Sequence, residues 1–224
     1  MKRFERLGEA RTPRGTLIEF YRHDGQYLLR ADGVELMSSR RHLSEDRLAD
    51  VACAGLQDAE SPRVLIGGLG LGFTLRAALG QLPASAEVVV AELLPEVIAW
   101  NANPGYGISV EALADPRVRM VQDDVVHVLD ANRDGFDAIM LDTDNGPDGM
   151  LISESAALYA ERGVARTLAA LREGGTIVYW SVAEDRPFAR LLRRAGLNVE
   201  AMQVPAHATA SHMHTLYRVR PPRR

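Results

Sequence analysis

Residues 63–74 read Arg-Val-Leu-Ile-Gly-Gly-Leu-Gly-Leu-Gly-Phe-Thr, and this stretch decides the fold class. A β-branched apolar run meets a cluster of glycines, and an Ala/Leu-rich helical pattern follows over residues 73–79. The glycines are Gly67, Gly68, Gly70 and Gly72. A strand, a glycine turn and a helix in this order are typical of the nucleotide site of an open α/β sheet, because glycine lets the backbone approach the ligand and the helix presents unpaired N–H groups. The spacing is G-x-G-x-G, which differs from the dinucleotide fingerprint G-x-G-x-x-G.

Residues 86–92, Ala-Glu-Val-Val-Val-Ala-Glu, predict a second buried strand that ends in an acid. An acid at the tip of the second strand of a Rossmann-type fold accepts hydrogen bonds from ribose hydroxyls. We therefore expect Glu92 to bind a ribose, with Leu93 beside it in the same site. The alternative is a solvated glutamate at the end of a strand.

The composition is that of an ordinary globular protein and excludes several classes of function. The chain has 224 residues, of which 46% are hydrophobic and 25% charged, and its formal net charge is −4. This charge lacks the basic footprint of a nucleic-acid-binding protein, and no apolar run reaches the ~20 residues of a membrane span. Cys53 is the single cysteine, which excludes intrachain disulfides and suits a reducing cytoplasm, the expected localisation. Lys2 is the single lysine, so an interior lysine cannot form a Schiff base.

The first quarter of the chain predicts a small β region. Residues 15–37 lack a helical period and form short strands separated by turns at His23-Asp-Gly25 and Asp32-Gly33, which indicates an antiparallel meander. A helix is expected to follow over residues 43–56, with Ser44 as its N-cap.

From Arg63 onward the pattern alternates between strands and helices. The predicted strands cover residues 63–67, 87–92, 117–121, 136–141, 175–181, 197–204 and 212–219, and the predicted helices cover residues 72–80, 95–101, 124–131, 163–172 and 185–195. Gly174 and Gly175 are expected to end the helix before the fifth strand. The last two strands have no helix between them, so we expect them to pair as an antiparallel hairpin.

These elements predict an α/β fold with a mostly parallel, seven-stranded, Rossmann-like sheet whose last strand is antiparallel. This is the outline of the S-adenosylmethionine-dependent methyltransferase class. We expect a small N-terminal β region with one helix over residues 1–57 and the catalytic domain over residues 58–224. The N-terminal region is expected to serve dimerisation, so the protein is predicted to be a homodimer.

Acidic residues follow the third and fourth of these strands. A carboxylate at Asp124, beside free backbone amides such as that of Val125, can bind the amino edge of an adenine. Asp142 begins a cluster that continues with Asp144 and Asp148. Such a cluster favours an amine or a sulfonium, or raises the pKa of one acid into the range of a general base; the alternative is a turn-rich loop solvated by its own aspartates. Ligands of open α/β sheets bind outside the carboxyl ends of the strands, so these acids are predicted to share one site with the glycine turn.

The sequence resembles the spermidine synthase family of aminopropyltransferases, and in particular its shorter bacterial branch. Glu35-Leu-Met-Ser-Ser is similar to the end of the family's N-terminal strand domain, and Asp115-Pro-Arg-Val precedes the third strand as it does there. Leu141-Asp-Thr-Asp-Asn-Gly-Pro resembles the family's Asp-Ser-Ser-Asp-Pro segment. The resemblance covers nearly the whole chain.

The resemblance implies a role for each acid. Glu92 would hold the ribose, Asp124 the adenine amino group, and Asp142 would take a proton from an attacking amine. The implied cofactor is S-adenosylmethionine or its decarboxylated form, and the implied partner is a small amine-bearing substrate.

Two departures from the family pattern decide between the possible reactions. Leu69 and Leu71 stand where the family's glycine loop carries the aspartate that binds the aminopropyl ammonium, and His42-Leu-Ser-Glu-Asp46 replaces a segment that helps bind the polyamine. Methyl transfer to a small amine, with Asp142 as base and Asp144 beside it, is therefore the preferred prediction. Aminopropyl transfer with relocated ammonium contacts, at Asp144 or Asp148, is the first alternative. A non-catalytic nucleoside-binding or scaffold protein is the second.

Two further groups of residues are weaker candidates. Tyr179 and Trp180, at the tip of the fifth predicted strand, could flank a cationic substrate, and ordinary core packing is the alternative. His207, His212 and His214 lie close in the sequence, but no carboxylate pattern accompanies them. No metal site is therefore predicted.

Overall fold

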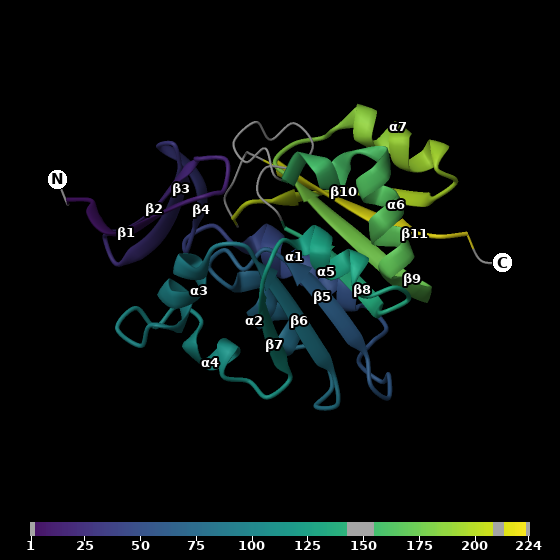
Figure 1. Cartoon of the computed structure of the whole chain (residues 1–224), viewed down its shortest axis with the longest axis horizontal. Coiled ribbons are helices and arrows are strands. Elements are labelled where there is room, and N and C mark those ends of the chain that lie inside the picture. The colour runs from purple at the N-terminus through teal and green to yellow at the C-terminus, as the bar shows by residue number, and fades with distance from the viewer. Residues whose placement is uncertain (1–2, 143–154, 208–212, 223–224) are drawn as a thin grey trace.

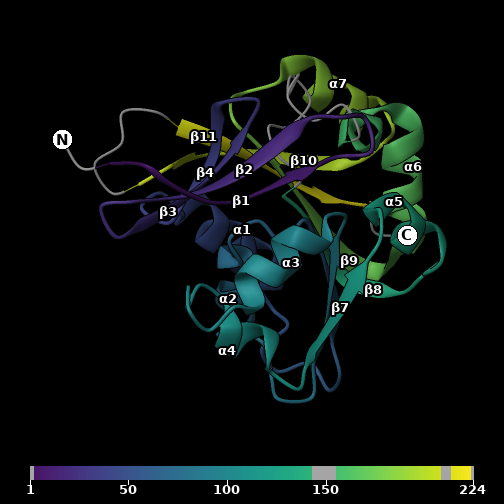
Figure 2. The same ribbon diagram turned by 60° about the vertical axis from the view of Figure 1, so that its left-hand side comes forward.

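The computed structural model describes residues 3–142, 155–207 and 213–222 of the chain. These residues form two β-sheets of different size (Figure 1). The smaller sheet comes from the N-terminal part of the chain, and the larger sheet and its helices come from the remainder. Figure 2 turns the molecule so that the smaller sheet comes forward.

The smaller sheet is an antiparallel meander, as predicted. Its strands, in sheet order, are β1 (Glu5–Arg11), β2 (Leu17–His23), β3 (Gln26–Ala31) and β4 (Val34–Ser38). Asp24 and Asp32 begin the two tight turns with φ angles of 52° and 46°, and each is followed by a glycine of positive φ, as a type I′ hairpin turn requires. Strand β1 was not predicted, because its sequence Glu-Arg-Leu-Gly-Glu-Ala-Arg contains few apolar residues.

The larger sheet has seven strands, and only one of them runs antiparallel to the others. The strands are β5 (Arg63–Gly67), β6 (Glu87–Glu92), β7 (Val118–Gln122), β8 (Phe136–Leu141), β9 (Leu171–Ser181), β10 (Asn198–Pro205) and β11 (Met213–Arg220). Their order is β10-β11-β9-β8-β5-β6-β7, and β11 pairs antiparallel with both of its neighbours. The predicted Rossmann-like sheet with an antiparallel last strand is confirmed.

Helices cover both faces of this sheet (Figure 1). The face that includes Val64 and Ile66 packs against α1 (Leu43–Cys53), α2 (Phe73–Leu79), α3 (Pro95–Ala102) and α4 (Val110–Leu113). The face that includes Leu65 packs against α5 (Val125–Asp130), α6 (Glu161–Ala170) and α7 (Arg186–Arg194), and a 3₁₀ turn covers Ser155–Tyr159. Within the described part of the chain, no helix is long and apolar enough to cross a membrane.

Two local predictions are corrected by the structure. Helix α1 starts after His42, and Ser44 lies fully buried in its first turn instead of capping it. Helix α6 ends at Ala170 and β9 begins at the next residue. Gly174 and Gly175 therefore lie inside a strand, next to an irregularity in its pairing with β8, and do not end the helix.

Helix α1 packs against the larger sheet, with α2, β8, β9, β10 and β11 as its neighbours. The smaller sheet contacts the rest of the chain through β1, which packs against α3, and through Phe20 of β2, whose ring stacks on that of Trp100 with 5.1 Å between ring centroids. The predicted boundary at residues 57–58 thus separates α1 in sequence from the sheet on which it packs.

Replacing Gly8 by alanine tests the contact between β1 and α3. An ideal Cβ at Gly8 would lie 2.6 Å from Nε1 of Trp100, and this ring is held by its stack on Phe20. We expect Gly8→Ala to lower the free energy of unfolding by about 1–3 kcal/mol in urea denaturation. Gly80→Ala is the matched control, because Gly80 has a helical φ of −69° and its nearest Cβ neighbour would be 3.5 Å away. Equal stability of the two variants would contradict the close contact.

Candidate functional site

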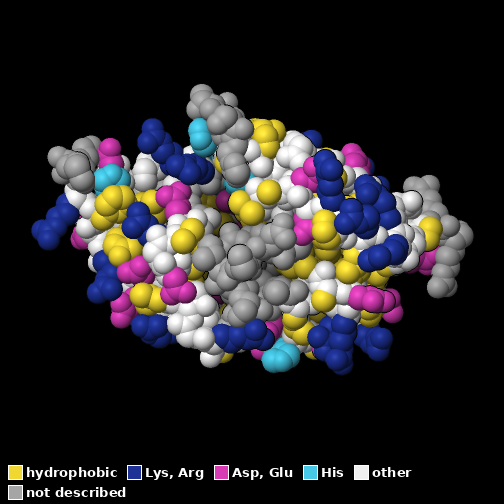
Figure 3. All heavy atoms as spheres, turned by 90° about the horizontal axis from the view of Figure 1, so that it is seen from above, with side chains coloured by type: hydrophobic (Ala, Val, Ile, Leu, Met, Phe, Trp, Pro, Cys, Tyr) yellow, Lys and Arg dark blue, Asp and Glu magenta, His cyan; other side chains and the backbone are white. Residues whose placement is uncertain are grey.

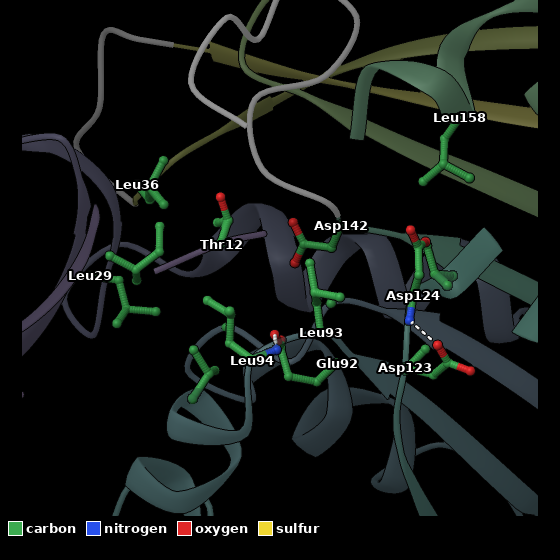
Figure 4. A pocket seen from close by; sticks show the side chains of 16 residues that line it. Thr12, Leu29, Leu36, Glu92, Leu93, Leu94, Asp123, Asp124, Asp142 and Leu158 are labelled. Atoms are coloured by element: carbon green, nitrogen blue, oxygen red, sulfur yellow. Dashed lines mark hydrogen bonds between the residues drawn. The ribbon is translucent and has the colours of Figure 1, made fainter. Parts of the chain in front are cut away.

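A cleft lies between the two sheets, at the carboxyl ends of β5, β6, β7 and β8 (Figure 4), and its empty space, open solvent at its mouth included, is about 800 Å³. Its described lining residues are Thr12, Ile18, Leu29, Leu36, Gly68, Gly70, Ala91, Glu92, Leu93, Leu94, Val97, Asp123, Asp124, Val125, Asp142 and Leu158. The sequence predicted seven of these residues: Gly68, Gly70, Glu92, Leu93, Asp124, Val125 and Asp142. The structure therefore brings the glycine turn and three predicted acids to one cleft.

The glycine turn after β5 requires glycine at the positions that face the cleft. Gly68 and Gly70 have φ angles of 91° and 53°, in the left-handed region that other residues rarely adopt. Gly67 is the last residue of β5, and its carbonyl accepts a hydrogen bond of 3.1 Å from the Asp142 N–H. Gly72, with φ of 71°, is the N-cap of α2 and lies outside the cleft lining.

Glu92 connects the glycine turn to the start of α3. One oxygen of its buried carboxylate accepts from the Leu69 N–H and the other from the Leu94 N–H, each at 2.9 Å. Burial raises the pKa of Glu92, and the backbone hydrogen bonds act in the opposite direction. A carboxylate has about four lone-pair sites, so both oxygens keep acceptor capacity for ribose hydroxyls.

Asp124 is the N-cap of α5, since its carboxylate accepts a hydrogen bond of 2.8 Å from the Val126 N–H. Asp123 also lines the cleft and was missed by the sequence analysis, although it directly precedes Asp124. Its carboxylate accepts from the Asp124 N–H at 2.8 Å, as Figure 4 shows, and contacts Nδ1 of His127 at 2.9 Å. The hydrogen bond with His127 lowers the pKa of Asp123.

Asp142 follows β8 and carries the most unusual carboxylate of the cleft. Its side chain is buried, and Oδ2 accepts a hydrogen bond of 3.0 Å from the Thr74 hydroxyl of α2. Burial raises the pKa of Asp142 above its ordinary range, and the Thr74 hydrogen bond offsets only part of this effect. Asp144 and Asp148, which were predicted as its neighbours in the site, lie outside the described residues.

The smaller sheet supplies an apolar wall that the sequence did not reveal. Leu29 and Leu36 lie on one side of Asp142, and the Asp123–Asp124 pair lies on the other (Figure 4). Ile18 of β2 also lines the cleft. The sequence predicted an antiparallel meander over residues 15–37, but not that part of this meander would line a cleft with the second sheet.

Tyr179 and Trp180 do not line the cleft. Tyr179 is fully buried on the face of the larger sheet that packs against α5, α6 and α7. There its ring contacts those of Tyr159 and Phe188. Trp180 is 7% exposed, and its ring meets the His214 ring edge-on at 4.6 Å between centroids. Both placements support the alternative of core packing over a direct contact with substrate.

The cleft is strongly acidic. Four of its described lining residues are carboxylates, Glu92, Asp123, Asp124 and Asp142, and none of the described lining residues is Lys, Arg or His. The exposed arginines of α7 are not among these lining residues, and Figure 3 shows Lys and Arg side chains gathered in the right-hand half of the face seen from above. The described residues contain no group of three or more His, Cys, Asp or Glu side chains that could hold a metal ion. The four carboxylates suit a ligand that carries positive charge.

Replacing Glu92 by glutamine tests its role in holding a nucleoside. The amide keeps one acceptor oxygen and adds a donor group, so either Leu69 N–H or Leu94 N–H loses its partner and the charge that attracts ribose hydroxyls is removed. We expect the Kd of 5′-methylthioadenosine, measured by calorimetry, to rise roughly 10- to 100-fold. Glu96→Gln, an exposed acid in the first turn of α3, is the control. An unchanged Kd in Glu92→Gln would exclude Glu92 from the nucleoside site.

The raised pKa of Asp142 predicts how its replacement affects stability. Because the folded protein holds a proton on this group at a pH where the unfolded chain has lost it, stability falls as the pH rises from about 4 through the folded pKa. Asp142→Asn cannot ionise, so we expect it to unfold at higher urea concentration than the parent protein at pH 8, by an amount of order 1–3 kcal/mol that shrinks toward pH 4.

Asp115→Asn provides a control with the opposite sign. Hydrogen bonds with Arg117 lower the pKa of Asp115 to about 2, so this carboxylate stabilises the fold above about pH 4 and loses that contribution as the pH falls. We expect Asp115→Asn to be less stable than the parent at pH 8. A loss of stability in both variants at pH 8 would contradict the raised pKa of Asp142.

Comparison with known proteins supports the fold. No protein-family model and no curated protein matches the sequence. Among solved structures, a spermidine synthase in complex with the transition-state analogue AdoDATO is similar, with a TM-score of 0.71 and 19% identity over 95% of this chain and 71% of the other. The spermidine synthase from Thermotoga maritima has a TM-score of 0.72 and 20% identity, over 95% of this chain and 72% of the other. The predicted resemblance to spermidine synthases is confirmed at the level of the fold.

Proposed function

We propose that this chain transfers an aminopropyl group from decarboxylated S-adenosylmethionine to an amine, with Asp142 as the base. The observation that carries the proposal is the charge of the cleft, which has four carboxylates and no cation among its described lining residues. S-adenosylmethionine itself would bring a carboxylate that needs a cationic partner, and burying an unpaired charge is costly. The decarboxylated donor brings only its sulfonium and its ammonium, both of which the acids attract.

The sequence that follows Asp142 adds to this argument. Residues 143–154 contain Asp144, Asp148 and Glu154 but no Lys, Arg or His. The fold likeness to spermidine synthases, one of them in complex with the transition-state analogue AdoDATO, also supports a donor of this kind. Together these observations favour aminopropyl transfer over the methyl transfer that the sequence analysis preferred.

The preference for methyl transfer rested on the absence of an acid from the glycine turn. In the structure Leu69 and Leu71 are buried in the hydrophobic core, so the turn offers its backbone to the cleft and not these side chains. The carboxylates that face the cleft come instead from the ends of neighbouring strands. An ammonium group therefore has acidic partners without an acid in the turn.

The proposed reaction is an in-line displacement. The neutral nitrogen of the acceptor attacks the aminopropyl carbon that is bonded to sulfur. An N–C bond forms, and the bond between this carbon and sulfur breaks with both electrons left on sulfur, which gives the thioether 5′-methylthioadenosine. The nitrogen then gives one proton to Asp142. A raised pKa suits a carboxylate to this role, and the Thr74 hydroxyl fixes its orientation.

The proposal is tested by identifying the products formed from S-adenosylmethionine and from decarboxylated S-adenosylmethionine, each with a panel of primary α,ω-diamines as acceptors. We expect 5′-methylthioadenosine from the decarboxylated donor, and a loss of kcat of roughly 10²- to 10⁴-fold in Asp142→Asn while 5′-methylthioadenosine still binds. Asp130→Asn, on the surface of α5, serves as the control. Formation of S-adenosylhomocysteine from S-adenosylmethionine would favour methyl transfer. If the protein bound none of S-adenosylmethionine, its decarboxylated form and 5′-methylthioadenosine, the scaffold alternative would be favoured.

A further inference from the structure

The peptide unit between Gly70 and Leu71 is held at both ends by side chains from two different elements. Its carbonyl, which belongs to Gly70, accepts a hydrogen bond of 2.8 Å from Nδ2 of Asn101 in α3. Its N–H, which belongs to Leu71, donates to Sδ of Met37 in β4 at 3.1 Å. Because the carbonyl and the N–H of a trans peptide point in opposite directions, these two contacts fix the plane of the unit.

Both side chains are buried and lie outside the lining of the cleft. Asn101 is 1% exposed and Met37 is 8% exposed, and neither is among the described residues that line the cleft, whereas Gly70 is. An ideal Cβ at Gly70 would lie 2.8 Å from both Sδ and Cε of Met37, so the thioether fills the space beside this glycine. The two side chains can therefore act on the cleft through the backbone of the turn.

The contacts of Asn101 show which end of its amide is in use. Nδ2 also donates to the Val97 carbonyl at 2.9 Å, and only the nitrogen of an amide can donate to two carbonyl groups. Oδ1 is buried and has no hydrogen-bond partner in the described part of the chain, which is unfavourable in itself. The favourable contribution of this amide therefore lies in its two donated hydrogen bonds, one within α3 and one to the turn.

The turn needs such contacts because its glycines do not fix their own conformation. Gly70 and Gly72 have φ angles of 53° and 71°, and glycine adopts either sign of φ at similar energy, so a peptide unit beside it rotates at little cost. The next peptide unit is also held at both ends. The Leu71 carbonyl accepts from the Ser109 hydroxyl at 3.0 Å. The Gly72 N–H donates to the Leu69 carbonyl at 2.8 Å. Hydrogen bonds thus select one conformation of the turn.

We propose that Asn101 and Met37 are positioning residues of the nucleoside site, which hold the Gly70–Leu71 peptide in the orientation against which the donor binds. The inference rests on the proposed function and adds two residues from outside the cleft lining. Rotation of this peptide would break both hydrogen bonds and change the surface that Gly70 presents to the cleft. Since Met37 belongs to the smaller sheet, the sheet that supplies the apolar wall also fixes the shape of the glycine turn.

The simpler interpretation is that Asn101 only stabilises α3 through its bond to the Val97 carbonyl, four residues earlier. Asn132, just after α5, makes the same kind of bond, because its Nδ2 donates to the Val128 carbonyl at 2.7 Å. Asn132 is not among the described residues that line the cleft. A purely structural role predicts that leucine at either position has the same effect on ligand binding, whereas a positioning role predicts an effect at Asn101 alone.

The test is calorimetric binding of 5′-methylthioadenosine to the parent protein, Asn101→Leu, Met37→Leu and the double variant, with melting temperatures measured alongside. We expect the Kd to rise about tenfold or more in Asn101→Leu, because a buried carbonyl loses its partner, and about two- to fivefold in Met37→Leu, because a thioether is a weak acceptor. The number of binding sites per chain should stay at the parent value. The rise in the double variant should be smaller than the product of the two single rises, because either substitution alone frees the same peptide.

Steady-state kinetics provide a second readout that a loss of stability would not produce. With decarboxylated S-adenosylmethionine as donor, we expect the KM of the donor to rise with the Kd, while kcat and the KM of the amine stay within about twofold of the parent values. Asn132→Leu and Met120→Leu are the matched controls. Met120 is a half-buried methionine of β7 outside the described cleft lining, and both control variants should bind 5′-methylthioadenosine as the parent does.

A parental Kd in Asn101→Leu, or an equal rise of the Kd in Asn132→Leu, would overturn the inference. A smaller number of binding sites with an unchanged Kd would overturn it as well, because it would show a loss of folded protein only. If Asn101→Leu is too unstable to measure, the Kd of Met37→Leu decides. Binding of 5′-methylthioadenosine without turnover in the parent protein would count against the proposed function alone, whereas a parent protein that does not bind it would overturn both.

Discussion

The geometry of the cleft depends on the two hydrogen bonds that Glu92 accepts from the Leu69 and Leu94 N–H groups. They join the turn after β5 to the start of α3 through one carboxylate at the end of β6. The turn can take this course because Gly68 and Gly70 adopt positive φ angles. Burying the carboxylate is unfavourable in itself, and the two donors offset part of that cost while leaving lone pairs that face the cleft.

The sequence predicted the residues whose position follows from strand order. Glu92, Asp124 and Asp142 end or follow parallel strands, and the carboxyl ends of such strands meet at one edge of the sheet. Ile18 and Leu29 were not predicted as lining residues, because contacts between two separate sheets leave no local pattern. The sequence could not show that the side chain of Tyr179 points away from the cleft, since the direction of a side chain at a strand end depends on the bulges and register of the neighbouring strands.

The acidic charge of the site is distributed differently from the pattern of the resembled family. The glycine turn has leucines where an acid was expected, and these leucines fill the core beneath the turn. The structure places a further buried acid, Glu45, on α1, and the charge of Asp142 contributes to raising its pKa, after burial. A missing acid in one motif therefore does not make the site neutral, because carboxylates from other elements can supply the same charge.

Burial of Asp142 creates a kinetic problem as well as an energetic one. The smaller sheet lines one side of the cleft with the apolar side chains of Ile18, Leu29 and Leu36. A raised pKa makes Asp142 a better acceptor of the proton but a slower donor of it to solvent. The base must nevertheless lose its proton once in every turnover.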